Sequence, residues 1–343
     1  MNIVLLLAHS IEEYDQVKLL TSLGYDVFSI GAYSDPAHPG DDKRPPIPEA
    51  PDHPELRAAC DAQRARLEAE RGAPGRALDW AKAELPDAVL DWADTVIVHH
   101  FEHTWLAPQW DRLRGKRVIW RTVGQSVEGN ERLMGPLRAQ GLQIVRYSPC
   151  ERAITGFAGE DALIRFCKDP DDWSGWTGSI AAVTNVTQHL RARDPYTNWG
   201  FWESSTRGLQ RRPFGPGSER IGGGGALNYD ALRKVLRDYR AYLYTGTQPA
   251  SYTLGLIEAM MTGIPVVSIG PSWMRVFPYG PDLFEGHKIV GNWYDDPDEA
   301  RAELLVYLSD PACARADSAH FRDTAIELFG RETIGTAWKA FLG

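Results

Sequence analysis

Short apolar runs alternate with helix-like segments from the start of the chain, and this alternation limits the fold more than any other feature. Residues 3–8 are continuously apolar, as is typical of a strand covered on both faces. A helical pattern over 12–23 ends at Gly24, and a second strand-like run covers 25–30. The order strand, helix, strand predicts a doubly wound α/β domain with a parallel sheet.

The second half of the chain repeats this architecture without a detectable sequence repeat. Between the halves, residues 170–179 are rich in Asp, Gly and Trp, which suits an interdomain linker. The predicted strands are 95–99, 117–121 and 142–146 in the first half, and 180–186, 241–244 and 264–269 in the second. We therefore expect two α/β domains of similar size with a cleft between them.

Charge and cysteine content exclude some classes of protein. The net charge of -9 over 343 residues argues against a histone-like binder, although a local basic stripe could still handle nucleic acid. The four cysteines lie far apart and form no C-x-x-C pair, so neither a disulfide framework nor a zinc site is indicated.

Nothing in the sequence indicates a membrane or export signal. The first residues lack the basic lead and cleavage site of a signal peptide. No apolar run approaches the roughly 18 residues that a membrane-spanning helix needs. We therefore expect a cytoplasmic protein without a membrane span; the sequence does not predict its oligomeric state.

The most informative segment is 242–268, where a strand, a turn, a helix and a second strand follow one another. The helix should begin near Ser251 or Thr253, either of which is a good N-cap, and end at Gly263. A helix N-terminus that faces a cleft offers free N–H groups to a diphosphate. Glu258, one to two turns inside, could accept both hydroxyls of a ribose. The alternative is an ordinary α/β unit with a solvated Glu258.

This segment resembles the donor-binding signature of GT-B glycosyltransferases related to family 4. In that signature a Glu-Ala pair precedes Gly-x-Pro-Val-Val, matched here by Glu258-Ala259 and residues 263–267. The resemblance implies that Glu258 binds the ribose of a nucleotide sugar. The family's second Glu, eight residues earlier, is Ala250 here, which leaves the sugar open. The residues that we expect around the donor are Ser251, Tyr252, Thr253, Leu254 and Glu258.

The resemblance extends through the C-terminal part. Residues 295–300 and 308–311 look like the start of the helix pair after the donor strand, and Phe329 and Trp338 look like part of a terminal helix that crosses back. It therefore implies two Rossmann-like doubly wound domains facing across a cleft. We expect the domains to be 1–168, on the acceptor side, and 169–325, on the donor side, with a crossing helix over 326–343.

The acceptor side is less well defined. The family's Gly-Gly loop after the first strand is absent, and residues 9–13 stand in its place. His99, His100 and His103 cluster just beyond a strand, where α/β active sites lie. We take His100, and then His99, as candidates to bond the substrate, and expect no metal. The further acceptor-side candidates are His9, Ser10, Glu13, Arg121 and Gln125.

A basic, aromatic stretch follows the first strand of the second half, where the resemblance implies a clamp on the donor diphosphate. The candidate residues are Arg191, Arg193 and Arg207; the alternative is a solvated basic surface over core aromatics. Asp169-Pro170-Asp171 matches the Asp-x-Asp of metal-dependent sugar transferases by letter, but the proline favours a turn.

Taken together, we expect sugar transfer from a UDP- or GDP-linked donor to a hydroxyl, without metal or cofactor. A retaining outcome follows only from the resemblance. The acceptor stays open between saccharide, lipid and DNA that carries 5-hydroxymethylpyrimidine, as in phage-type transferases. Two alternatives remain: a GT-B epimerase that acts on the nucleotide sugar, and a nucleotide-sugar-binding protein without catalysis.

Overall fold

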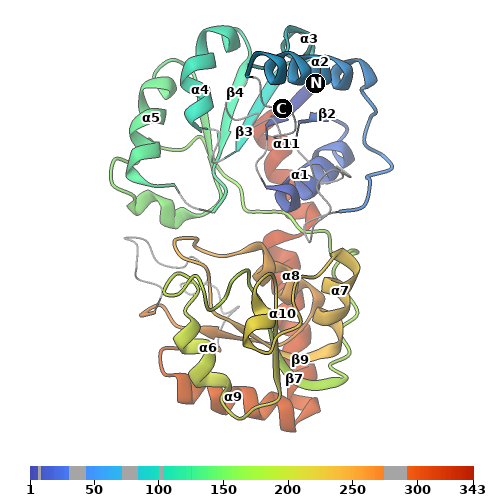
Figure 1. Cartoon of the computed structure of the whole chain (residues 1–343), viewed down its shortest axis with the longest axis vertical. Helices are drawn as coiled ribbons and strands as arrows, with labels where there is room; N and C mark the ends of the chain where they lie inside the picture. The colour runs from blue at the N-terminus through green and yellow to red at the C-terminus, as the bar shows by residue number, and fades with distance from the viewer. Residues whose placement is uncertain (7–8, 31–43, 72–83, 100–102, 125, 274–291) are drawn as a thin grey trace.

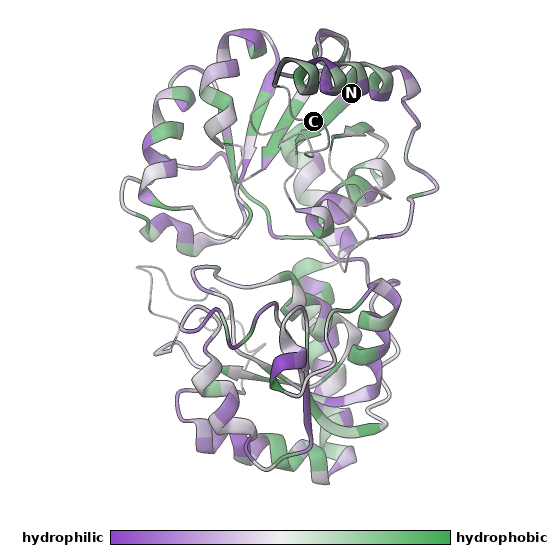
Figure 2. Cartoon of the chain, in the orientation of Figure 1, coloured by the Kyte–Doolittle hydropathy of each residue, from purple (hydrophilic) through white to green (hydrophobic). Residues whose placement is uncertain are grey.

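The computed structural model describes residues 1–6, 9–30, 44–71, 84–99, 103–124, 126–273 and 292–343. Two α/β domains lie one above the other, each with a twisted parallel sheet inside layers of helices (Figure 1). This confirms the predicted fold class. Hydrophobic residues concentrate on the strands and polar residues on the outer helical surfaces (Figure 2).

The sheet of the first domain is parallel throughout, in the order β2-β1-β3-β4-β5-β6. Its strands are β1 Asn2–Leu6, β2 Asp26–Ser29, β3 Thr95–His99, β4 Arg117–Arg121, β5 Gln143–Arg146 and β6 Ala162–Leu163. The helices are α1 Ser10–Ser22, α2 Pro54–Arg71, α3 Asp87–Trp92, α4 His103–Gln109 and α5 Glu128–Arg138, with 3-10 turns at Trp110–Leu113 and Pro149–Ala153.

Successive residues of β1 enter different cores, which explains its continuous apolar sequence. Ile3 and Leu5 pack in one cluster, whereas Val4 and Leu6 pack in the other. Side chains alternate across a strand, so a sheet covered on both faces needs apolar residues at every position.

The second domain repeats this arrangement with the strand order β11-β10-β9-β7-β8, again parallel. Its strands are β7 Ile180–Val186, β8 Arg211–Phe214, β9 Tyr239–Tyr244, β10 Val266–Ile269 and β11 Trp293–Tyr294. Its helices are α6 Trp199–Thr206, α7 Tyr229–Asp238, α8 Leu254–Thr262, α9 Pro297–Ser309 and α10 Pro311–Phe329, with a 3-10 turn at Ser218–Ile221.

The last helix, α11 (Arg331–Leu342), returns to the first domain. Ile334, Trp338 and Leu342 are buried in the same core as Ile3 and Leu5. Arg117 of β4 donates hydrogen bonds to the carbonyls at the end of this helix. Both chain termini therefore lie on the first domain, as Figure 1 shows. The resemblance implied a crossing helix over 326–343 that includes Phe329, whereas in the structure Phe329 ends α10 and α11 begins at Arg331.

Some elements differ from the prediction. The polar, helix-favouring sequence of residues 75–92 predicts a helix there, but within the described part of this range helix covers only Asp87–Trp92. The short strands β6, β8 and β11 were not predicted, because two to four residues at or near a sheet edge leave little periodic signal. None of the described helices is both long enough and apolar enough to cross a membrane.

Candidate functional site

The carboxyl ends of the two sheets face each other, and side chains join them directly. Tyr147, just after β5, accepts a hydrogen bond through its hydroxyl from the N–H of Ser251, just before α8, at 2.8 Å. The Tyr252 hydroxyl donates to the Tyr147 carbonyl at 2.8 Å. In open α/β sheets, ligands bind at the carboxyl ends of the strands, so this junction is where a site is expected.

Helix α8 begins and ends as the sequence predicts. Thr253 is the N-cap, with its hydroxyl accepting from the Leu256 N–H at 3.3 Å. Gly263 ends the helix in the left-handed region at φ 92°. A Cβ on Gly255 would lie 3.8 Å from the Val186 carbonyl, so the first turn of α8 lies beside the end of β7. Its first N–H groups thus sit at the carboxyl edge of the second sheet.

An aromatic cluster surrounds the loop before α8. Tyr147 stacks on Phe166 at 4.9 Å between ring centroids, and Tyr252 packs edge-on against Tyr147 at 5.1 Å. Phe329 adds a further ring, 5.4 Å from Tyr252. Ser251 is buried beside this cluster, and its hydroxyl oxygen makes no hydrogen bond within the described chain. A buried polar atom without a hydrogen-bond partner is a candidate to bond a ligand.

Glu258 is buried in a network of charges rather than solvated. Its Oε1 atom lies 2.6 Å from the Lys168 ammonium and 3.5 Å from the Arg44 guanidinium. Lys168 also lies 2.6 Å from Asp15 Oδ2, which comes from α1 of the first domain. Burial raises the pKa of Asp15 to about 6, although Lys168 opposes this. Burial disfavours the Lys168 ammonium, but Asp15 and Glu258 outweigh it and raise its pKa.

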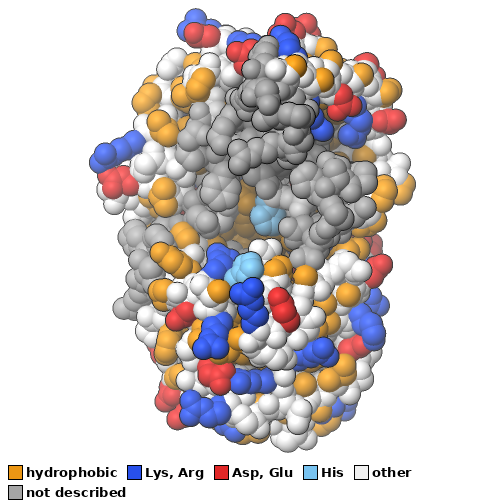
Figure 3. Space-filling model, in the orientation of Figure 1, with side chains coloured by type: hydrophobic (Ala, Val, Ile, Leu, Met, Phe, Trp, Pro, Cys, Tyr) orange, Lys and Arg blue, Asp and Glu red, His pale blue; other side chains and the backbone are white. Residues whose placement is uncertain are grey.

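Two of the three predicted clamp arginines lie near this edge. Arg191 and Arg193 are exposed in the loop that follows β7, and Arg191 lies over the Trp199 ring at 5.8 Å. Basic and histidine side chains gather on the rim of a hollow between the two halves of the molecule (Figure 3). Guanidinium groups so placed can reach an anionic ligand at the domain junction.

The structure does not bring Arg207 to this edge. Arg207 follows α6 and precedes β8, and β8 begins at Arg211 opposite Val183 of the parallel strand β7. The residue therefore lies toward the amino end of the sheet, where its carbonyl accepts from Arg301 of α9. A shallow cavity of about 440 Å³ lies there, lined by Ser204, Arg207, Asp296, Pro297, Asp298 and Arg301. The intervening helix α6 carries the chain away from the junction.

The acceptor-side candidates have different surroundings. His9 is exposed at the N-cap of α1, and Ser10 begins that helix. Glu13 is buried and accepts from the Ser29 hydroxyl at 2.6 Å. Arg121 is fully buried, donates to the carbonyls of Ile164 and Arg165 and lies over the Phe166 ring, so it supports the strand ends from inside.

The histidine cluster is only partly described. His99 ends β3 and is 2% exposed, as its place on a doubly covered strand requires. His100 and Gln125 lie outside the described residues, as does the side chain of His103 at the start of α4. Their predicted roles stay predictions.

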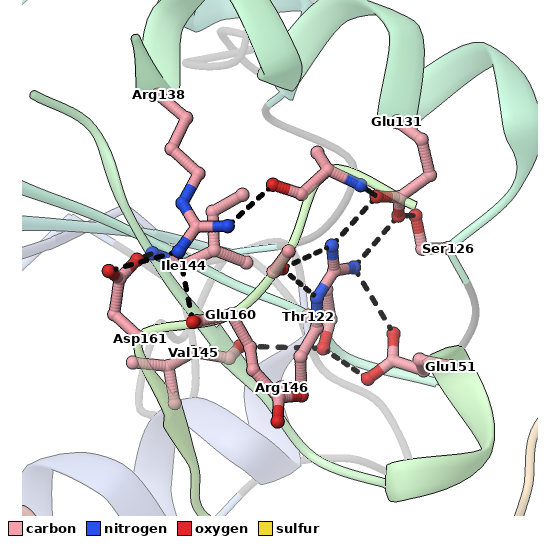
Figure 4. Close-up of polar contacts among 12 residues, drawn as sticks. Thr122, Ser126, Glu131, Arg138, Ile144, Val145, Arg146, Glu151, Glu160 and Asp161 are labelled. Atoms are coloured by element: carbon pink, nitrogen blue, oxygen red, sulfur yellow. Dashed lines mark hydrogen bonds and ion pairs between the residues drawn. The ribbon is translucent and has the colours of Figure 1, made fainter. Parts of the chain in front are cut away.

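A buried polar network that the sequence did not reveal connects Thr122, Glu131, Arg146 and Glu151 (Figure 4). Arg146, at the end of β5, donates two hydrogen bonds to Glu131 of α5, at 2.8 and 2.7 Å. Glu151 accepts from the Thr122 hydroxyl at 2.8 Å and from the Tyr147 N–H at 3.2 Å. Burial raises the pKa of Glu151 to about 7. The only sequence signal is that Arg146 ends a strand and that Thr122 and Glu151 follow strands; Glu131, inside α5, carries no such signal.

Asp169 and Asp171 form a turn, as the sequence predicts. The Asp171 N–H donates to Asp169 Oδ1 at 3.0 Å, and Lys18 and Arg331 pair with Asp169 Oδ2. Among the described residues there is no cluster of three or more His, Cys, Asp or Glu side chains that could hold a metal ion.

No family model and no curated protein matches this chain in sequence. Solved structures do match it along its whole length. Sucrose-phosphate synthase from Thermosynechococcus elongatus aligns with a TM-score of 0.63 at 14% identity, covering 100% of this chain and 98% of that one. Anabaena HepE, solved with UDP and glucose, aligns with a TM-score of 0.64 at 12% identity, covering 99% and 98%.

A third similar structure is the trehalose 6-phosphate synthase of Burkholderia multivorans, with a TM-score of 0.56 at 10% identity over 100% of this chain and 98% of that one. Matches at such low identity report the fold rather than the reaction. The alignments cover both sheets and the helix α11 described above. This protein therefore has the GT-B fold of these glycosyltransferases.

Proposed function

We propose that this protein is a glycosyltransferase that moves a sugar from a UDP- or GDP-linked donor to a hydroxyl group of an acceptor. The observation that carries the proposal is the position of Glu258 and of the α8 N-terminus at the junction of two GT-B domains. A related structure in the same fold was solved with UDP-glucose, which supports a nucleotide sugar as the donor.

The residues at the junction suit the parts of such a donor. The N–H groups of Leu254 and Gly255 begin α8 and would face a diphosphate, helped by the positive end of the helix dipole. Arg191 and Arg193 would add positive charge from the loop after β7. Glu258 would accept ribose hydroxyls, and the unpartnered Ser251 hydroxyl would bond the donor.

These groups would act mainly by stabilising charge. As the bond between sugar and phosphate breaks, negative charge grows on the departing diphosphate, and fixed N–H groups and guanidinium groups stabilise it without reorganising. We propose that this suffices without a metal ion, and that the sugar keeps its anomeric configuration. A histidine, either His100 or His99 as the sequence predicts or else His9 at the N-cap of α1, would bond the transferred sugar or the acceptor.

The acceptor is proposed as a hydroxyl compound, with 5-hydroxymethylated DNA as the first candidate to test. The side chains of Arg191, Arg193 and Tyr196 are exposed in the loop after β7, and Arg191 lies over the ring of Trp199 at the start of α6. Arginines next to aromatic rings suit phosphates and stacked bases. A saccharide or lipid would use the same groups for different contacts.

The test combines the protein with UDP-, GDP- and ADP-sugars, with and without DNA that contains 5-hydroxymethylcytosine. Nucleotide release and product mass are followed together, with Glu258→Gln as the variant that should lose activity. Release with a gain of one sugar mass on DNA supports transfer and identifies both substrates. Release without a gain on DNA directs the search to saccharide or lipid acceptors.

Two results would instead favour another function. A change of sugar configuration without net transfer would indicate an epimerase. Binding of a nucleotide sugar without release would indicate a binding protein. Either result would overturn the proposed transfer while leaving the fold unchanged.

A further inference from the structure

We propose that Lys168 is a positioning residue that holds Glu258 so that one carboxylate oxygen remains for the ribose of the donor. This inference rests on the proposed function, since it concerns how the same site recognises its nucleotide. Lys168 touches neither the α8 N-terminus nor any acceptor-side candidate in the contacts of the described residues, and would act only through Glu258.

The main chain of Lys168 is fixed where the domains meet. Lys168 follows β6 of the first domain, and its N–H donates to the carbonyl of Phe329 at 2.9 Å. It also pairs with Gly330, between α10 and α11. The base of the side chain is thus held by the segment that crosses back to the first domain. The ammonium group then reaches inward and has no exposed surface.

The contacts on Glu258 are divided unequally between its two oxygens. Lys168 and Arg44 both approach Oε1, at 2.6 and 3.5 Å. No contact of Oε2 with another described residue occurs among the side-chain bonds and ion pairs of this carboxylate. A carboxylate can accept about four hydrogen bonds, two on each oxygen. With Oε1 occupied by cations, Oε2 is the atom that can accept from a ribose hydroxyl.

The charges around Lys168 explain why it keeps the Glu258 carboxylate in this position. Asp15 and Glu258 flank its ammonium, both at 2.6 Å, so one cation joins a carboxylate from each domain. Arg44 supplies a second cation and lies over the ring of Tyr229 of α7 at 4.9 Å. Without Lys168, two buried carboxylates would share one guanidinium, and Glu258 would turn toward Arg44.

The donor ribose would therefore be recognised only in the paired arrangement of the domains. Asp15 belongs to α1 and Glu258 to α8, and Tyr14 and Tyr229 of the same two domains meet at 6.2 Å between ring centroids. The preference for a ribose over a deoxyribose then depends on a residue that does not touch the nucleotide. Replacing Lys168 should therefore change the preference for ribose without removing a contact to the nucleotide, and this effect can be measured.

The experiment compares the binding of UDP and 2′-deoxy-UDP, and of the matching guanine pair, by titration calorimetry. The unmodified protein should prefer the ribonucleotide by about tenfold to a hundredfold, the value of a hydrogen bond to a charged group. In Lys168→Met this preference should fall to within about threefold, while the affinity for the deoxynucleotide changes little. Lys168→Arg should restore most of the preference.

The matched control replaces a second lysine, which also pairs with carboxylates close to Lys168. Lys18 of α1 pairs with Asp169 and Asp172 just after Lys168, at 2.9 and 2.8 Å, without contacting Glu258. Lys18→Met should lower the melting temperature but keep the preference for ribose. If Lys168→Met does not fold, the double variant Asp15→Asn with Lys168→Met removes one charge of each sign and is used instead.

Each result separates the two proposals. If the unmodified protein binds neither nucleotide pair, the proposed function itself is overturned. If it binds them with a ribose preference that Lys168→Met retains, only the positioning role is overturned. An equal loss of affinity for both members of a pair would likewise overturn it, because that is the effect of a general structural role.

Discussion

The hydroxyl of Tyr147 and the N–H of Ser251 form a hydrogen bond of 2.8 Å between the two domains. The same hydroxyl donates to the Gly124 carbonyl at 2.7 Å, so it has a partner on each side. The loop before α8 is therefore held by a side chain of the other domain. The geometry of the candidate donor site depends on how the domains pair.

Replacing Tyr147 with Phe should remove both of these bonds and leave the ring in place. The Ser251 N–H would then be buried without a partner, at a cost of about 1–3 kcal/mol in the free energy of unfolding. Urea denaturation measures this cost. Tyr25→Phe is the matched control, because its hydroxyl makes one exposed contact of 3.5 Å with the Gly343 carbonyl. Equal losses in both variants would contradict the assigned role of Tyr147.

The pH dependence of stability should change in Glu151→Gln. The folded-state pKa of Glu151 is raised from 4.5 to about 7 by burial, so the folded protein binds a proton that the unfolded chain has released. Its contribution is therefore fully present below pH 4.5 and lost as the pH rises toward 7. The substitution should remove a decline on the order of 3 kcal/mol between these values, measured by denaturation across pH.

In the same network, Glu131→Gln should change the pH dependence of stability in the opposite direction. Burial opposes ionisation of Glu131, but hydrogen bonds from Arg146 outweigh it and lower the pKa. Its contribution is present above the unfolded pKa and lost as the pH falls, so this variant should lose most stability near neutral pH and less in acid. Parallel pH profiles for the two variants would refute the assignment.

Trp338→Ala should destabilise the first domain although the residue belongs to the last helix. Trp338 has no exposed surface and is buried in the same core as Ile3 and Leu5 of β1. Removing a buried Trp typically costs about 3–5 kcal/mol. Chemical denaturation measures the loss, and Lys339→Ala, on the exposed side of the same helix, should change stability little. A small loss in Trp338→Ala would mean that α11 is not part of this core.

Gly263→Ala should be destabilising where Gly129→Ala is not. Gly263 adopts φ 92°, and an added Cβ would also lie 2.9 Å from the Ser318 hydroxyl, so we expect a loss of more than about 1 kcal/mol. Gly129 lies near the start of α5 with open space around it, and alanine there should stabilise by about 0.5–1 kcal/mol. Thermal melts of both variants, run in parallel, measure the difference.

Local sequence predicted those elements whose signals lie within a few residues. The apolar runs of β1 and β3, the cap residue Thr253 and the terminating Gly263 each act on their own neighbourhood. Arg207 shows where this reasoning stops. It lies close in sequence to Arg191 and Arg193, but the helix α6 between them returns the chain to the amino ends of the strands.

The buried charges could not be predicted from the sequence. Lys168 and Glu258 are 90 positions apart, and the network of Glu131, Arg146 and Glu151 joins a helix, a strand end and a turn. From the sequence alone, a single polar residue at such a place is expected to be exposed to solvent. Only the packing of one element on another removes them from water and makes partners necessary.

By itself, the sequence determined the two parallel α/β domains, a helix that begins near Ser251 or Thr253 and the presence of Glu258 one to two turns inside it. The tertiary structure alone decided that Glu258 is buried against Lys168, that Tyr147 holds the loop before α8, and that Arg207 faces away. The physical reason is the distance along the chain over which each interaction acts. Hydrophobic periodicity and capping act over one or two turns, whereas burial and ion pairing depend on chain segments that meet only after folding.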